Sequence, residues 1–105
     1  RFADLLDWAG QRLTTRLSVE DLAEASAMSP RNFARAFVRE VGMTPAKAVE
    51  HLRVEAARGA LRQGASVEQA ARTAGFGDAE RLRRAMLRTY GQTPQALRRK
   101  ARAEL

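Results

Sequence analysis

The sequence contains one pattern twice, and this internal repeat limits the folds that the chain can adopt. The tetrapeptide Gly-x-Thr-Pro occurs at 42–45 and again at 91–94, 49 residues later. Ser-Val-Glu, followed by Asp or Gln, occurs at 18–21 and again at 66–69, 48 residues later. The second copy is therefore one residue longer than the first between the Ser-Val-Glu and Gly-x-Thr-Pro segments, and the added residue lies near Gly77. The chain contains two copies of a unit of 28 residues, 18–45 in the first copy, separated by a connecting segment.

Each copy has the signals of two short helices joined by a turn. Ser18 and Ser66 each stand three residues before an Asp or Gln side chain, the pattern that caps the start of a helix. Ser29, which precedes a proline, and Asp78 mark the starts of the second helices. Gly75 suits the left-handed end of a helix. The second helices are expected at 30–41 and 79–90.

The second helix of each copy combines an apolar face with a basic face. At about 100° per residue, one face collects the apolar side chains, which are Phe33, Ala36, Phe37 and Val41, then Leu82, Ala85, Met86 and Tyr90. The opposite face carries mostly basic side chains, which are Arg31, Arg35 and Arg39, then Glu80, Arg84 and Arg88. Two helices and a tight turn, with a basic outer stripe on the second helix, are typical of helix-turn-helix units.

A connecting helix and an N-terminal helix complete the expected fold. Thr44 caps the connecting helix and Gly64 ends it, and its apolar stripe is Val49, Leu52, Ala56 and Ala60. A helix of about 19 residues spans about 28 Å, close to the separation of about 34 Å between major grooves on one face of DNA. Phe2, Leu5, Leu6, Ala9 and Leu13 predict the N-terminal helix. We expect an all-α chain with three parts: 1–43, 44–64 and 65–105.

Charge and composition narrow the function. The net charge of +7 comes from 19 basic and 12 acidic residues, and all of the excess lies in residues 51–105. A polyanionic partner is indicated, nucleic acid first and an anionic membrane surface second. With no cysteine and one histidine, disulfides and Cys/His metal sites are excluded. No apolar run is long enough to cross a bilayer, and no cofactor site or catalytic nucleophile is arranged in the sequence.

Three segments resemble the DNA-binding domain of the AraC/XylS family of bacterial transcription regulators. They are LSVEDLAEASAMSPRNFARAF at 17–37, A-x-x-x-G-F at 71–76 and GQTPQALR at 91–98. The resemblance covers Phe2 to about Arg99 and implies seven helices that bind double-stranded DNA as one unit, in the cytoplasm at the nucleoid. It is greatest for the GlxA-type branch, which implies a PfpI/amidotransferase-like N-terminal sensor domain elsewhere in the full-length protein. RNA polymerase is the further partner that the resemblance implies.

The positions of the motifs imply which residues contact DNA. Base contacts are expected at Arg31, Asn32, Ala34, Arg35, Glu80, Arg81, Arg83 and Arg84. Phosphate contacts are expected at Ser29, Arg39, Thr44, Lys47, Arg53, Asp78, Arg88 and Thr93.

Ala34 and Glu80 each allow two interpretations. Ala34 offers a methyl group to thymine, or only fills space. Glu80 accepts a hydrogen bond from cytosine, or pairs with Arg84 one turn later, which we favour.

Two other functions stay open. A non-specific architectural DNA binder would share the basic helices, and so would a module that binds proteins or a membrane surface. The aromatic residues, Tyr90 included, fall at core spacing, which argues against stacking on single-stranded nucleic acid. The apolar helix faces are expected to pack on each other, which argues against a membrane surface.

Overall fold

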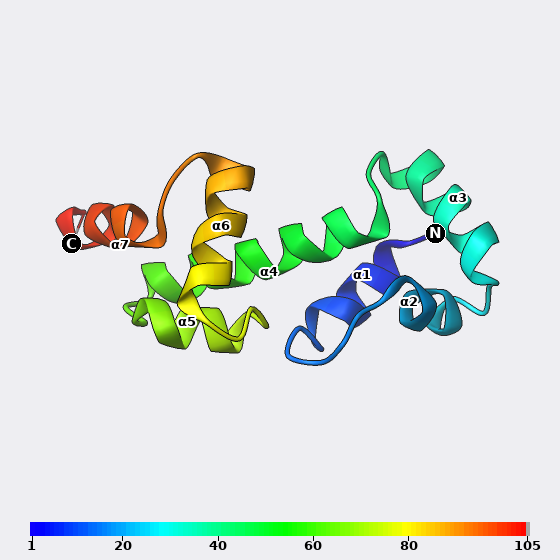
Figure 1. Ribbon diagram of the computed structural model, residues 1–105, viewed down its shortest axis with the longest axis horizontal. Coiled ribbons are helices and arrows are strands. Elements are labelled where there is room, and N and C mark those ends of the chain that lie inside the picture. Colours follow the sequence, from blue (N-terminus) through cyan, green and yellow to red (C-terminus); the bar gives the residue numbers. More distant parts are fainter. Residues whose placement is uncertain (105) are drawn as a thin grey trace. The chain divides into compact units, whose positions relative to one another are not determined.

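The computed structural model describes residues 1–104, and in that range it contains seven α-helices and no strand (Figure 1). The helices are α1 Ala3–Gly10, α2 Val19–Ala25, α3 Pro30–Val41, α4 Pro45–Arg62, α5 Val67–Thr73, α6 Ala79–Tyr90 and α7 Pro94–Ala103. The chain divides into two compact units, Arg1–Glu50 and His51–Leu105. The division falls inside α4, so each unit contains one part of that helix. The all-α prediction with seven helices is confirmed.

The first helix of each copy begins with a reciprocal cap, as the sequence predicts. The hydroxyl of Ser18 accepts a hydrogen bond from the amide of Asp21 at 3.1 Å, and the Asp21 carboxylate accepts one from the Ser18 amide at 3.0 Å. Ser66 and Gln69 make the same two bonds at 3.1 and 2.9 Å. Each cap satisfies amide groups that a helix start leaves without partners.

The turn after this helix also repeats, although its residues differ. The amide of Met28 donates to the carbonyl five residues earlier at 3.0 Å, and that of Phe76 does so at 2.9 Å. This bond closes a turn in which the preceding residue is left-handed. That residue is Gly75 with φ 91° in the second copy, but Ala27 with φ 56° in the first. Ala27 therefore holds a conformation that side chains disfavour.

The second helices, α3 and α6, have the bounds that the sequence predicts. Both end at a left-handed glycine, Gly42 with φ 87° and Gly91 with φ 69°. Their buried residues are Phe33, Ala36 and Phe37 in α3, and Leu82, Ala85 and Met86 in α6.

An aromatic cluster fills the core of the unit Arg1–Glu50. The ring centroids of Phe2, Phe33 and Phe37 lie 5.2 to 5.6 Å from one another. The expected helical stripe ran on to Leu13, but α1 ends at Gly10. The chain then turns, with the amides of Gln11 and of the residue after it each donating three residues back. Leu13 is still buried, because the turn directs it into the core.

The core of the unit His51–Leu105 is aliphatic and shows that the predicted α4 stripe is partly wrong. Val49 is buried in the first unit, but Ala56 is exposed. In the second unit α4 instead buries Val54, Ala57 and Leu61, spaced by three and four residues. One helix serves two cores, so its buried positions do not follow one stripe.

Candidate nucleic-acid interface

The outer side of α3 presents a row of arginines. Ser29 fixes the start of the helix, because its hydroxyl accepts a hydrogen bond from the amide of Asn32 at 3.3 Å. Arg31, Arg35 and Arg39 are exposed on the side away from the buried phenylalanines. In residues 1–104 none of these three arginines belongs to an ion pair. Their guanidinium groups are therefore available to a partner from outside the chain.

Ala34 lies at the edge of the arginine row of α3, next to Arg31, and is half-buried. Asn32 is exposed at the first turn. Both residues flank the arginine row, so α3 gathers all of the base contacts expected in the first copy.

The outer side of α6 is also rich in arginine, but its charges are paired. The Asp78 carboxylate caps the helix by accepting from the Arg81 amide at 2.8 Å, and lies 3.8 Å from that residue's guanidinium. One oxygen of Glu80 lies 3.3 Å from Arg83 and 3.2 Å from Arg84. The predicted pairing of Glu80 with Arg84 is confirmed. All of these pairs are exposed, so each contributes little to stability and can open when a partner binds.

The remaining expected contacts lie at helix starts and on the helices α4 and α6. Thr44 caps α4 and Thr93 caps α7, each accepting from the amide three residues later at 3.2 and 3.1 Å. Lys47 and Arg88 are exposed. Arg53 is half-buried on α4, and burial lowers its pKa. Backbone amides at such helix starts attract phosphate groups.

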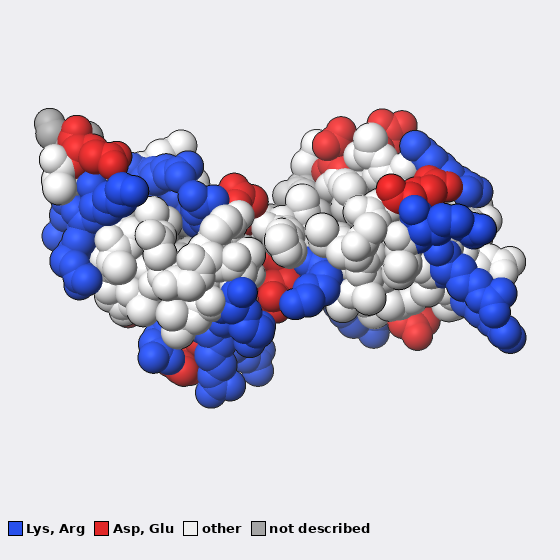
Figure 2. Space-filling view, turned by 90° about the horizontal axis from the view of Figure 1, so that it is seen from above, with Lys and Arg blue, Asp and Glu red and all other residues white. Residues whose placement is uncertain are grey.

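The two units differ in charge as well as in pairing. Arg1–Glu50 contains seven basic and seven acidic residues, whereas His51–Leu105 contains twelve and five. Figure 2 shows Lys and Arg side chains gathered over the α3 end of the first unit and spread in several groups over the second. The second unit therefore carries the whole excess of positive charge.

The geometry agrees with the comparisons with known proteins. A family described as "Helix-turn-helix domain" matches residues 22–100, which is most of the chain. The chain belongs to the AraC-type helix-turn-helix family. This AraC-type chain is 43% identical over 81 residues to the HTH-type transcriptional regulator Rv1931c of Mycobacterium tuberculosis, covering 76% of the chain and 31% of the relative. It is 31% identical over 99 residues to the transcriptional activator RhaS of Yersinia pestis, covering 93% and 36%. The chain thus spans about a third of the length of these curated relatives.

Solved structures agree with the AraC-type assignment. The DNA-binding domain of AdpA, a global transcriptional factor solved in complex with a target DNA, superposes with a TM-score of 0.89. It is 33% identical, and the match covers 98% of this chain and 94% of that one. An AraC-type regulator of Chromobacterium violaceum, 24% identical with a TM-score of 0.87 over 95% and 90% of the two chains, shares the fold. Membership of a family of regulators also supports the prediction that this domain is not an enzyme. The GlxA-type branch stays a prediction.

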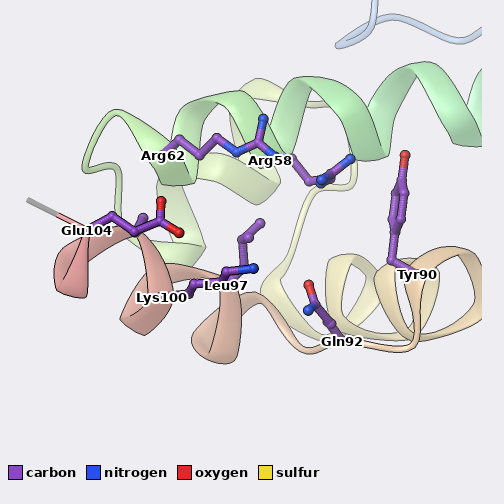
Figure 3. Close-up of a pocket in the computed structure, with 8 residues that line it drawn as sticks. Arg58, Arg62, Tyr90, Gln92, Leu97, Lys100 and Glu104 are labelled. Carbon is purple, nitrogen blue, oxygen red and sulfur yellow. The ribbon is translucent and has the colours of Figure 1, made fainter.

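Helical spacing predicts that Tyr90 lies in the core, and this prediction is wrong. Its side chain is 39% exposed, and its hydroxyl donates to a carboxylate oxygen of Glu55. The Arg58 guanidinium lies 4.2 Å from the ring centroid of Tyr90, and Figure 3 shows these two side chains. The same guanidinium lies 2.8 Å from the Glu55 oxygen. The hydroxyl bond lowers the pKa of Glu55 and raises that of Tyr90. This brace ties the end of α6 to α4 within the second unit, and it could not be predicted from helical spacing because it joins residues 35 apart.

Sequence reasoning also passed over two exposed apolar residues on the candidate interface. Val38 on α3 and Leu87 on α6 are 45% and 36% exposed. The offset of 49 residues makes them equivalent in the two copies, and that offset could have identified them.

Two further properties bear on function. In the described residues, no helix has the length and apolar character needed to span a membrane. Residues 1–104 also contain no group of three or more His, Cys, Asp or Glu side chains that could bind a metal ion.

Proposed function

We propose that this chain binds double-stranded DNA sequence-specifically, as the DNA-binding domain of a bacterial transcription regulator. The observation that carries the proposal is the row of exposed, unpaired arginines on α3, the second helix of a helix-turn-helix unit. The similarity to the AdpA domain, which was solved in complex with a target DNA, supports it. In such units the second helix lies in the major groove.

In the first copy, the N-terminal half of α3 reads bases. Arg31 and Arg35 can each donate two hydrogen bonds to the O6 and N7 atoms of guanine. Asn32 has the donor and acceptor that recognise adenine, and Ala34 offers a methyl group to thymine. Arg39, near the end of α3, binds phosphate.

In the second copy, base reading by α6 requires its ion pairs to exchange. Arg83 and Arg84 release Glu80 when they turn to base edges, and Arg81 releases Asp78. The exposed pairs cost about 0–1 kcal/mol each to open. The freed Glu80 can accept a hydrogen bond from cytosine N4. Phosphates are held by Arg53 and Arg88, and by the helix starts at Asp78 and Thr93.

The finer proposal is that α3 and α6 enter successive major grooves on one face of the duplex. The support is that both helices have 12 residues, begin at a side-chain cap and end at a left-handed glycine, which indicates two equivalent recognition helices. Hydroxyl-radical footprinting should then show two protected regions about one helical turn apart. A single protected region would contradict this arrangement.

The partners of the whole protein are also proposed. The matched segments make up 31% and 36% of the relatives, which are named as a transcriptional regulator and a transcriptional activator. This supports a sensor domain in the full-length protein, contact with RNA polymerase and action at the bacterial nucleoid in the cytoplasm.

A selection experiment tests the proposal. Duplexes recovered from a randomised pool should share a motif, and the motif should resist competition by scrambled DNA in a gel shift. Arg35→Ala should weaken binding to the selected duplex roughly 5- to 150-fold and relax the preference at one base pair. Arg102→Ala, which removes an equal charge from α7, is the matched control and should retain the preference. Equal affinity for selected and scrambled DNA would favour an architectural binder instead.

A further inference from the structure

Two of the most exposed large apolar side chains occupy one position of the repeat. Val38, Leu87 and Tyr90 are the large hydrophobic residues with high exposure in the described chain, at 45%, 36% and 39%. Tyr90 has contacts of its own, with Glu55 and Arg58. Val38 and Leu87 lie 49 residues apart, the offset that relates α3 to α6. Isolated exposed apolar residues need no explanation, but two at equivalent positions indicate a shared role.

Both residues lie on the outer side of the C-terminal half of their helix, next to an expected phosphate contact, Arg39 in α3 and Arg88 in α6. On α3, Val38 points within about 20° of the direction of Arg31 and about 60° of that of Arg35, taking about 100° per residue. Leu87 has the same relation to Glu80 and Arg84 on α6. Neither side chain is among the buried residues of its helix. Each residue therefore keeps more than a third of its apolar surface outside the core, available to a partner.

We propose that Val38 and Leu87 contact thymine methyl groups in the major groove, and so add thymine to the sequence that the chain selects. This inference rests on the proposed DNA binding. The basic residues around Val38 match the charge of DNA and not that of an apolar protein surface. The 5-methyl group of thymine is the apolar group that base edges expose in the major groove.

The spacing along the helix identifies which thymine is contacted. Val38 follows Arg35 by three residues, a rise of about 4.5 Å, and successive base pairs are about 3.4 Å apart. Each thymine should therefore lie one or two base pairs from the base read by Arg35 or Arg84. Leu87 is larger and reaches further, so its thymine should be the more strongly selected.

Replacing single thymidines by deoxyuridine tests the contact, because the change removes the methyl group and keeps every hydrogen-bonding group. The probe is the duplex selected from the randomised pool. Wild-type protein should lose affinity about fourfold at one thymine in each half of the site, the value of one buried methyl-sized group. In Leu87→Ala the loss at one of these positions should fall below about twofold, and in Val38→Ala the loss at the other should do so.

The matched control is Thr89→Ala, which shortens a side chain of α6 on the side opposite Leu87 and should keep the full deoxyuridine effect. Circular dichroism melts should show that each variant is folded at the temperature of the binding assay, since both side chains are only partly buried. A selected motif without thymine, deoxyuridine without effect, or an equal effect in wild type and both variants would overturn the inference. In those cases the unmodified duplex is still preferred over scrambled DNA. Loss of that preference in the wild type would instead overturn the proposed function, and this inference with it.

Discussion

Ala27→Gly should stabilise the unit Arg1–Glu50. In residues 1–104, Ala27 is the one non-glycine residue with positive φ, at 56°. Its equivalent in the second copy is Gly75, with φ 91°. Ala27 is also exposed, so removing its methyl group sacrifices no packing.

The magnitude follows from two opposing effects. A left-handed conformation costs an alanine about 1–2 kcal/mol. Glycine makes the unfolded chain more flexible, which offsets about 0.4–1 kcal/mol of that gain. The net stabilisation is about 0–1.6 kcal/mol, and at its centre of about 0.8 kcal/mol the midpoint of thermal unfolding should rise by roughly 3–6 °C. Gly75→Ala should destabilise the second unit by a similar amount.

Fluorescence separates the first unit from the second. Trp8 is the only tryptophan of the chain, so its emission follows the unfolding of Arg1–Glu50. The control is Ala25→Gly at the last residue of α2, where φ is not positive and glycine should destabilise by up to about 1 kcal/mol. A midpoint that falls in Ala27→Gly as it does in Ala25→Gly would refute the reasoning, because it would mean that Ala27 is not strained.

Three other predictions concern charge. Glu80→Gln should tighten binding to the selected duplex at low salt if Glu80 only pairs with Arg84, and weaken it at one C·G pair if Glu80 reads cytosine, as measured by gel shift. Lys47→Ala should weaken binding to all sequences alike and reduce the slope of log K against log salt by about 0.9; a sequence-dependent loss would contradict a phosphate contact. Hydrogen bonds from Arg16 and Ser18 lower the pKa of Asp21 from 3.8 to about 2, so the stability that it contributes is complete above pH 3.8 and is lost as pH falls towards 2. Asp21→Asn should remove that part of the pH dependence of thermal unfolding, and an unchanged profile would argue against the prediction.

The parts of the fold that local interactions determine could be predicted from the sequence. The caps at Ser18 and Ser66 use bonds between residues three apart, so residue type and spacing are sufficient to identify them. The glycines that end α3 and α6 are equally local, because the left-handed conformation selects them. For this reason the bounds of both helices were correct.

Burial within α4 and at Tyr90 depends on contacts between distant residues and could not be predicted in the same way. A stripe calculation assumes one buried face, whereas α4 contributes to two cores. Tyr90 has core spacing, but Glu55 and Arg58 offer its hydroxyl and ring polar partners at the surface. The candidate contacts on α3 and α6 lie on the outer sides of these helices, as the sequence predicts. The basic face predicted for α6 did not indicate that Glu80 pairs with two of its arginines, which reduces the number of unpaired positive charges on that helix.

The two units contribute unequally to the net positive charge of the chain. Arg1–Glu50 is neutral overall, while His51–Leu105 carries the full +7. Long-range attraction to a polyanion acts on net charge and speeds encounter, so the second unit would provide most of the attraction to DNA, while α3 and α6 both read bases. Substitutions on α3 could then change the choice of target genes during evolution and leave the speed of the search along the chromosome nearly untouched.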